Sequence, residues 1–299
     1  MAKSIIDYQN AYKEITDILM KNTNILAIFV LGSMVTGDLW EESDIDLFTI
    51  YKDDFEQVRD LYSEVMDIPV HIKFLSKGAF KETYYECGKK DVIKNSLISS
   101  KLIYSIDYEI SELYEKIIYS VNSDKGRWNL VYLGNLLKEI GICKKYLSTG
   151  RGYTAYELLI RALDNFSKLY LSINGYTVSK DSLNMACNLN EDLNKRIKKL
   201  FYTEMNDENI KSIISYMESY LDYNIEKASK EILDFIKDED KELSSYEIKN
   251  NDYFKKFNIK AEEILKVLYK NNVLTKNKRE FRDHNECLLA TENVYSYKH

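Results

Sequence analysis

Two short segments near the N-terminus carry residue types suited to phosphate and metal chemistry: Gly32-Ser33, and the pair Asp44 and Asp46. A glycine lets the backbone approach a phosphate closely, and N–H groups at the start of a helix can hold that phosphate together with the Ser33 hydroxyl. Such a turn predicts that Gly32 and Ser33 bind the phosphates of a nucleoside triphosphate.

The two aspartates are spaced to act together. Residues i and i+2 of a strand face the same side, about 6–7 Å apart at the backbone, so Asp44 and Asp46 can converge on one metal or on a metal pair. Hard oxygen ligands select Mg²⁺ or Mn²⁺. A metal held there would neutralise the triphosphate and stabilise charge in the transition state.

Apolar runs and amphipathic stretches predict the elements that position these residues. Strands are expected at residues 25–31, 45–50, 70–75 and 102–104, and helices at residues 4–21, 34–39, 53–66 and 77–98. The first part of the chain, residues 1–107, is therefore predicted to be an α/β domain in which a small mixed sheet packs against helices.

Strand signals nearly vanish after residue 107, and the rest of the chain is predicted to be helical. Helical periodicity marks residues 109–121, 128–148, 153–174, 190–202 and 207–238. These stretches predict an all-α helical bundle domain over residues 108–245. The charge-rich residues 237–251 suggest a linker to a small appendage, residues 246–299, with a helix at 261–269 and a hairpin or extended tail at 286–297. This appendage faintly resembles a winged helix.

The order strand, Gly-Ser, short helix and strand with Asp-x-Asp, with ten residues between Ser33 and Asp44, resembles the signature of the DNA polymerase β-like nucleotidyltransferases. Kanamycin-type antibiotic nucleotidyltransferases and minimal nucleotidyltransferases are the most similar members. Residues 70–76 and 102–104 resemble the next strand and the closing strand of that family. The resemblance covers about the first third of the chain. It implies Mg²⁺-dependent transfer of a nucleoside monophosphate from an NTP to a hydroxyl, with release of pyrophosphate.

The sequence departs from this family at the strand after Asp-x-Asp, which usually supplies a third carboxylate where His71 stands here. His71 could serve as a general base, or it could be an ordinary strand residue beside Lys73. In the second case Glu64 or Asp67 could supply the acid.

The resemblance also concerns the helical domain, where kanamycin-type enzymes carry a glutamate that acts as base. Glu139 lies in the comparable region, but the favoured interpretation is an ordinary surface glutamate on a helix.

Composition limits the setting and the partners. The chain has 299 residues, a net charge of −6, four cysteines without a Cys-x-x-Cys pair, and no apolar run of membrane length, which favours a cytoplasmic protein. The acidic charge disfavours nucleic acid and favours a small cationic acceptor, such as an aminoglycoside-like antibiotic. Two alternatives stay open: an enzyme that attaches AMP to proteins, and an inactive nucleotide-binding regulator. A homodimer is also left open.

Overall fold

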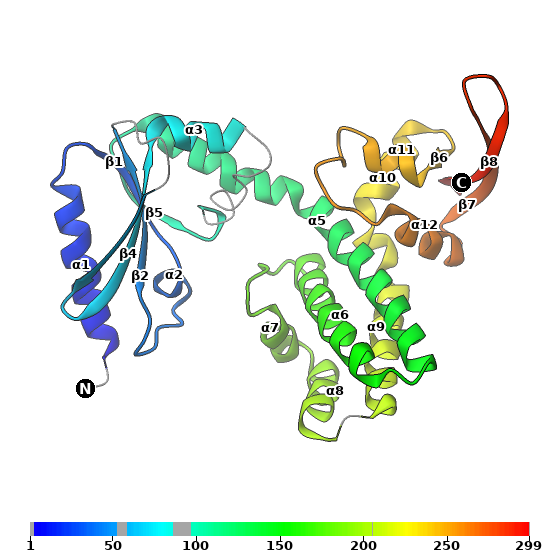
Figure 1. The fold of residues 1–299 in the computed structure, drawn as a ribbon, viewed down its shortest axis with the longest axis horizontal. Coiled ribbons are helices and arrows are strands. Elements are labelled where there is room, and N and C mark those ends of the chain that lie inside the picture. The colour runs from blue at the N-terminus through cyan, green and yellow to red at the C-terminus, as the bar shows by residue number, and fades with distance from the viewer. Residues whose placement is uncertain (1–2, 53–58, 86–96, 205, 299) are drawn as a thin grey trace. The chain divides into compact units, whose positions relative to one another are not determined.

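The computed structural model describes residues 3–52, 59–85, 97–204 and 206–298. The chain divides into two compact units, Met1–Ser123 and Asp124–His299. The first unit contains a mixed sheet covered by helices, and the second is mostly helical (Figure 1). This agrees with the predicted fold class. Within the described part of the chain, every helix is too short or too polar to cross a membrane.

The sheet of the first unit brings the two sequence motifs to neighbouring strands. Its described strands are arranged in the order β3-β4-β2-β1-β5. Strands β2 and β4 are parallel, whereas the other neighbouring pairs are antiparallel. The strands are β1 (Ile25–Val30), β2 (Ile45–Tyr51), β3 (Arg59–Val65), β4 (Ile68–Ser76) and β5 (Lys101–Ser105). The four strands predicted from apolar runs are β1, β2, β4 and β5.

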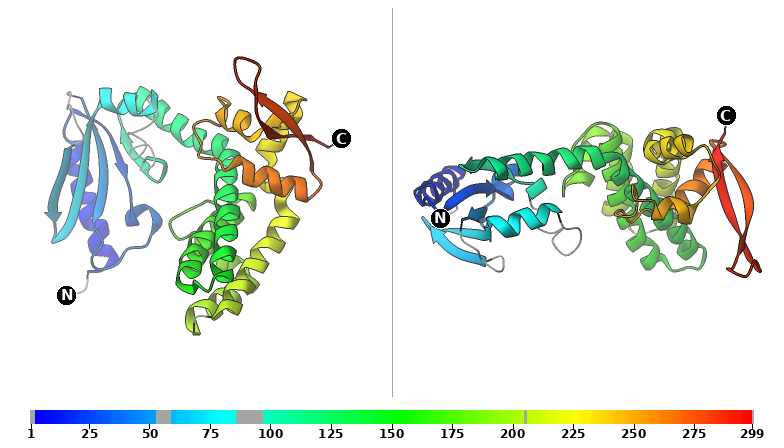
Figure 2. Two further views of the ribbon diagram at one scale, coloured as in Figure 1. Left: turned by 45° about the vertical axis from the view of Figure 1, so that its right-hand side comes forward. Right: turned by 90° about the horizontal axis from the view of Figure 1, so that it is seen from above.

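Each face of this sheet has its own apolar core. Helices cover both faces (Figure 2). Helix α1 (Ile5–Met20) covers one face, where Tyr8 and Ile15 join the apolar side chains of β1, β2 and β4. Helix α3 (Lys77–Tyr85) and the start of α5 (Tyr108–Ser148) cover the other, with Phe80 and Ile110 packed against Phe29, Phe48 and Leu75. The sheet is therefore packed on both faces.

One prediction in this unit is wrong. Residues 59–65, expected in a helix over 53–66, form the edge strand β3, and residues 53–58 lie outside the described part of the chain. Met66 and Asp67, both with positive φ, make the two-residue turn into β4. Almost every side chain of β3 is exposed, so the strand leaves no apolar pattern in the sequence. The helix expected at 77–98 is α3 as far as residue 85, and residues 86–96 are not described.

The second unit is built around one apolar core shared by its helices. The two helices expected at 109–121 and 128–148 are a single helix, α5. The helix expected at 207–238 is two helices, because the chain turns at Ser229. The helices that follow α5 are α6 (Gly152–Ile173), α7 (Ser182–Leu189), α8 (Glu191–Tyr202), α9 (Asp207–Ala228) and α10 (Lys230–Glu239). Of these, α7 was not predicted from the sequence.

The C-terminal residues form a small sheet and two short helices. Strand β6 (Leu243–Ser244), α11 (Ser245–Asn250) and α12 (Ala261–Lys270) precede a hairpin of β7 (Leu274–Arg282) and β8 (Leu288–Tyr297), with sheet order β6-β8-β7. The linker expected at 237–251 is wrong, because Leu243 and Ile248 are buried in the same core as the bundle helices. The boundaries at residues 107 and 245 stay predictions.

Candidate active site

The turn after β1 places Gly32 directly against the carboxylate of Asp46. The Leu31 N–H donates to the Asp46 carbonyl at 3.0 Å, which ties the end of β1 to β2. Gly32 follows with φ 63° and ψ −146°, a conformation that is essentially restricted to glycine. A Cβ on Gly32 would stand 2.9 Å from Asp46 Oδ2. The turn therefore requires glycine both for its backbone and for its contact with Asp46.

The short helix α2 (Ser33–Thr36) starts immediately after Gly32 and ends at Gly37, which has φ 82°. Ser33, predicted to bind phosphate, is the first residue of this helix and is partly exposed. The structure thus brings Gly32, which Ser33 directly follows, beside Asp46. Their binding of phosphate stays a prediction.

The two aspartates lie at the start of β2. Asp46 is the second residue of that strand and pairs in parallel register with His71 of β4. It shares a face with Phe48, which packs beneath α3 and α5, but its own side chain is 35% exposed. Asp44 lies one residue before the strand and is exposed. Both carboxylates are therefore accessible at this end of the sheet.

A buried tyrosine holds the loop between the motifs. The Tyr8 hydroxyl, on α1, lies 2.9 Å from the Ser43 carbonyl and 2.9 Å from the Trp40 carbonyl. The Trp40 N–H donates to Ser43 Oγ at 3.0 Å. Burial, with the nearby charge of Asp44, raises the pKa of Tyr8 above its usual value, so the hydroxyl stays a donor. Sequence reasoning missed Tyr8, because only the fold brings it next to Ser43.

His71 lies between two carboxylates. Its Nδ1 is 3.0 Å from Asp46 Oδ1, and its Nε2 is 2.6 Å from Asp60 Oδ1 on β3. The Tyr62 ring stacks on the imidazole at 4.4 Å between centroids with an interplanar angle of 4°. Lys73 Nζ is 3.8 Å from the same Asp60 oxygen. The structure therefore brings the predicted His71 to Asp46, but both of its ring nitrogens face carboxylates.

This arrangement bears on the proposed role of His71. A general base must direct an unprotonated nitrogen at the proton that it removes. Here each ring nitrogen already faces a carboxylate oxygen at hydrogen-bond distance. The positions of the nitrogens therefore favour a residue that holds Asp46, and its action as a base stays a prediction.

Asp60 and Tyr62 are two further site residues that sequence reasoning missed. They lie at alternate positions of β3, opposite Lys73 and His71 of β4. Their i, i+2 spacing was a usable signal, but it was obscured because residues 53–66 were expected to be helical. Glu64, weighed as a substitute acid, continues the same face of β3, and Asp67 lies in the turn.

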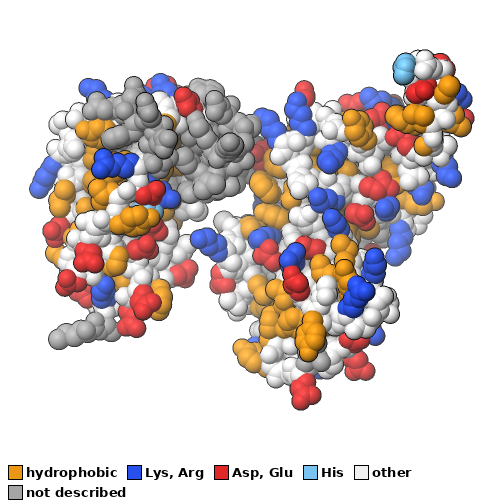
Figure 3. Space-filling view, in the orientation of Figure 1, with side chains coloured by type: hydrophobic (Ala, Val, Ile, Leu, Met, Phe, Trp, Pro, Cys, Tyr) orange, Lys and Arg blue, Asp and Glu red, His pale blue; other side chains and the backbone are white. Residues whose placement is uncertain are grey.

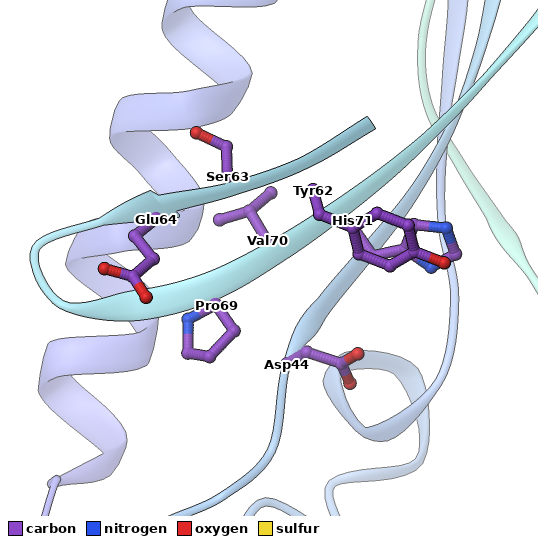
Figure 4. Close-up of a pocket in the computed structure, with 7 residues that line it drawn as sticks. All are labelled: Asp44, Tyr62, Ser63, Glu64, Pro69, Val70 and His71. Atoms are coloured by element: carbon purple, nitrogen blue, oxygen red, sulfur yellow. The ribbon is translucent and has the colours of Figure 1, made fainter. Parts of the chain in front are cut away.

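A pocket of about 420 Å³ opens beside these residues (Figure 4). The described residues that line it include the carboxylates of Asp44 and Glu64 and no lysine or arginine. The full lining is Asp44, Tyr62, Ser63, Glu64, Pro69, Val70 and His71. A pocket with this lining suits a small ligand that carries positive charge.

Glu139, predicted as a base, lies on the part of α5 that belongs to the second unit. Its Oε2 accepts a hydrogen bond from Asn165 Nδ2 at 3.0 Å. Burial raises the pKa of Glu139, and the Asn165 hydrogen bond only partly opposes this. Its position relative to Asp46, and with it a role in the site, stays a prediction.

The side chains around Asp46 fit a hard divalent cation. Asp46 Oδ2 faces the Gly32 backbone, and the exposed Asp44 carboxylate can supply further oxygen ligands. Asp46 Oδ1 is taken by His71. Among the described residues, no group of three or more His, Cys, Asp or Glu side chains could hold a metal. Asp44 and Asp46 would therefore have to share a cation with the substrate or water.

A mixed sheet with a Gly-Ser turn at one strand and Asp-x-Asp at the next defines a nucleotidyltransferase-like fold. Residues 13–109 match the family described as polymerase beta, nucleotidyltransferase. The N-terminal domain thus belongs to the DNA polymerase β-like nucleotidyltransferase superfamily.

A solved structure shares the fold over nearly the whole chain. The nucleotidyltransferase-like protein from Exiguobacterium sibiricum 255-15 is similar with a TM-score of 0.61 at 11% sequence identity, covering 97% of this chain and 99% of that chain. At this identity the similarity concerns the fold alone. No curated protein matches the chain in sequence.

Proposed function

We propose that this chain is a Mg²⁺-dependent nucleotidyltransferase that moves a nucleoside monophosphate from an NTP to a hydroxyl of a small cationic acceptor, such as an aminoglycoside-like molecule. The contact between Gly32 and Asp46 carries the proposal. A Cβ added to Gly32 would lie 2.9 Å from Asp46 Oδ2, so the glycine turn directly adjoins a carboxylate of the Asp-x-Asp strand. A triphosphate bound at the turn would meet a metal bound at that carboxylate.

The proposed roles of the residues follow from the position of the Gly32 turn beside Asp46. Gly32 and Ser33 would bind phosphate oxygens, while Asp44 and Asp46 would hold Mg²⁺ or Mn²⁺. The metal would supply charge stabilisation at the phosphate oxygens. The acceptor oxygen would attack the α-phosphorus, the bond from that phosphorus to the bridging oxygen would break, and pyrophosphate would leave. Glu139, through the resemblance alone, and His71 are the candidates to accept the hydroxyl proton, and burial raises the pKa of Glu139.

The charge of the pocket supports a cationic acceptor. Asp44 and Glu64 line it without a lysine or arginine among its described lining residues, and the Tyr62 ring adds a face that attracts ammonium groups. The whole chain, with a net charge of −6, contributes in the same direction.

Transfer assays with each α-³²P-labelled NTP and Mg²⁺ test the proposal. We expect label on a member of an aminoglycoside panel, and its loss in Asp46→Asn. The matched control is Asp17→Asn, which alters an exposed aspartate of α1. Label on protein in a cell lysate would favour the AMP-attaching alternative. Binding of an NTP without any transfer would favour the inactive regulator.

Binding can be measured separately from transfer. An NTP that binds only the folded chain should stabilise it by about 2.7 kcal/mol at a hundredfold excess over Kd, which a thermal melt detects. No shift with any NTP at millimolar concentration would contradict the proposal as a whole.

A further inference from the structure

The oxygen atoms of Asp46 are not equivalent. Oδ1 faces His71 Nδ1 at 3.0 Å, whereas Oδ2 faces the Gly32 turn. The His71 side chain is only 13% exposed and is held on its other side by Asp60 Oδ1, 2.6 Å from Nε2. With Tyr62 stacked on the ring, the imidazole has little freedom to turn away from Asp46. One oxygen of Asp46 is therefore already occupied by a protein donor.

This pairing limits the number of cations. Two metals about 3.5–4 Å apart need carboxylates whose separate oxygens reach both ions. Asp46 Oδ1 already lies 3.0 Å from His71 Nδ1, and Asp44 is the only further described carboxylate on the Asp-x-Asp segment from Asp44 to Tyr51. On the β4 side of Asp46 the imidazole takes up the space that a second cation would need, and the Lys73 ammonium lies beyond it, 3.8 Å from the Asp60 carboxylate. This ammonium repels a cation at short range.

We infer that this centre binds a single divalent cation with the triphosphate, held by Asp44 and Asp46 Oδ2, and that His71, braced by Asp60, occupies the second cation position. The inference rests on the proposed function, because the cation is counted together with a bound triphosphate. His71 and Asp60 act as positioning residues: they fix which Asp46 oxygen faces the turn. Asp60, on the edge strand, thereby gains a role that its exposed position does not suggest.

Counting Mn²⁺ tests this inference. Free Mn²⁺ is measured by electron paramagnetic resonance while the ion is titrated into the full chain with an ATP analogue that has a methylene group between the α- and β-phosphates. We expect one Mn²⁺ per chain in the complex. His71→Asp removes the imidazole and adds a carboxylate, so its complex should take up a second Mn²⁺, whereas His71→Asn should still bind one. His284→Asp, the same substitution at an exposed histidine of the C-terminal hairpin, is the matched control and should bind one.

The outcomes separate the two ideas. Two ions per native chain with the analogue bound would overturn the single-cation inference and leave the proposed function standing. No binding of the analogue to the native chain would overturn the proposed function and the inference with it. If His71→Asp does not fold, the counts for the native chain and for His71→Asn decide the matter.

Discussion

Gly32 brings the turn after β1 against the Asp46 carboxylate, so a single methyl group tests whether this contact matters. Gly32→Ala forces a side chain into a backbone conformation with φ 63° and sets its Cβ 2.9 Å from Asp46 Oδ2. We expect a loss of about 1–3 kcal/mol in the free energy of unfolding and loss of the melting shift produced by Mg²⁺ and NTP. Urea unfolding and ligand melts measure the two effects.

The matched control for this substitution is Gly37→Ala, at the other end of α2. Gly37 also has positive φ, 82°, but an added Cβ there would meet no atom within 4 Å. This variant should lose stability through backbone strain alone and keep the ligand shift. An unchanged ligand shift in Gly32→Ala would show that the contact with Asp46 plays no part in binding.

Tyr8 supports the site from beneath, and its hydroxyl can be removed without changing the shape of the core. Tyr8→Phe removes the donor of the Ser43 carbonyl, whereas the Trp40 carbonyl keeps the Ser43 N–H as a donor at 2.9 Å. An unpaired buried carbonyl costs about 1–3 kcal/mol, and the loop that presents Asp44 should loosen, so both stability and NTP affinity should fall. Tyr12→Phe, on the same helix, removes a hydroxyl that does not hold this loop. Equal behaviour of the two variants would argue against a positioning role for Tyr8.

At the scale of elements, the start of α5 depends on a carboxylate. Asp107 accepts from the N–H groups of Glu109 at 3.0 Å and Ile110 at 3.3 Å, and it pairs with Lys77 of α3. Burial alone would raise the pKa of Asp107, but the Lys77 contact and the backbone donors outweigh it, and the pKa is lowered.

The lowered pKa of Asp107 in the folded state determines how the stability of the chain changes with pH. The stabilisation is complete above the unfolded pKa of about 3.9 and is lost as pH falls through the folded pKa. The melting temperature of the native chain should therefore fall more steeply between about pH 5 and pH 3 than that of Asp107→Asn. Asp17→Asn should follow the native curve. Parallel curves for native and Asp107→Asn would contradict this account of the helix start.

The elements differ in how clearly the sequence predicts them, and burial explains the difference. β1 and β2 have buried side chains on both faces and appear as apolar runs, and β4 alternates buried and half-buried residues over most of its length. β3 lies at the edge, is exposed almost throughout, and follows residues without a turn signal. Its Asp60 and Tyr62 were missed for that reason. Gly32, Ser33, Asp44 and Asp46 could be predicted because their spacing is local, whereas the Tyr8 and Asp60 contacts depend on tertiary structure.

At the scale of the whole molecule, charge alone was a poor guide to boundaries. Residues 237–251 carry many charges, yet Leu243 and Ile248 turn into the bundle core and β6 pairs with β8. A few buried side chains are enough to fix a polar segment to the core, so that it does not act as a linker. The face of the second unit seen in Figure 3 mixes both signs of charge with scattered apolar side chains.

Because the C-terminal residues share the core of the bundle, damage to α12 should be felt throughout the second unit. Leu265 of α12 is fully buried in that core, whereas Leu289, in the β7–β8 hairpin, is 60% exposed. Leu265→Ala should lower the free energy of unfolding by about 2–5 kcal/mol, because the cavity lies among packed helices. Leu289→Ala, the same substitution at an exposed position, should change it little. In Leu265→Ala, the backbone amides of α9 and α10, as well as those of α12, should exchange hydrogen faster than in the native chain. Exchange that rises in α12 and the hairpin alone would mean that these residues form an independent appendage after all.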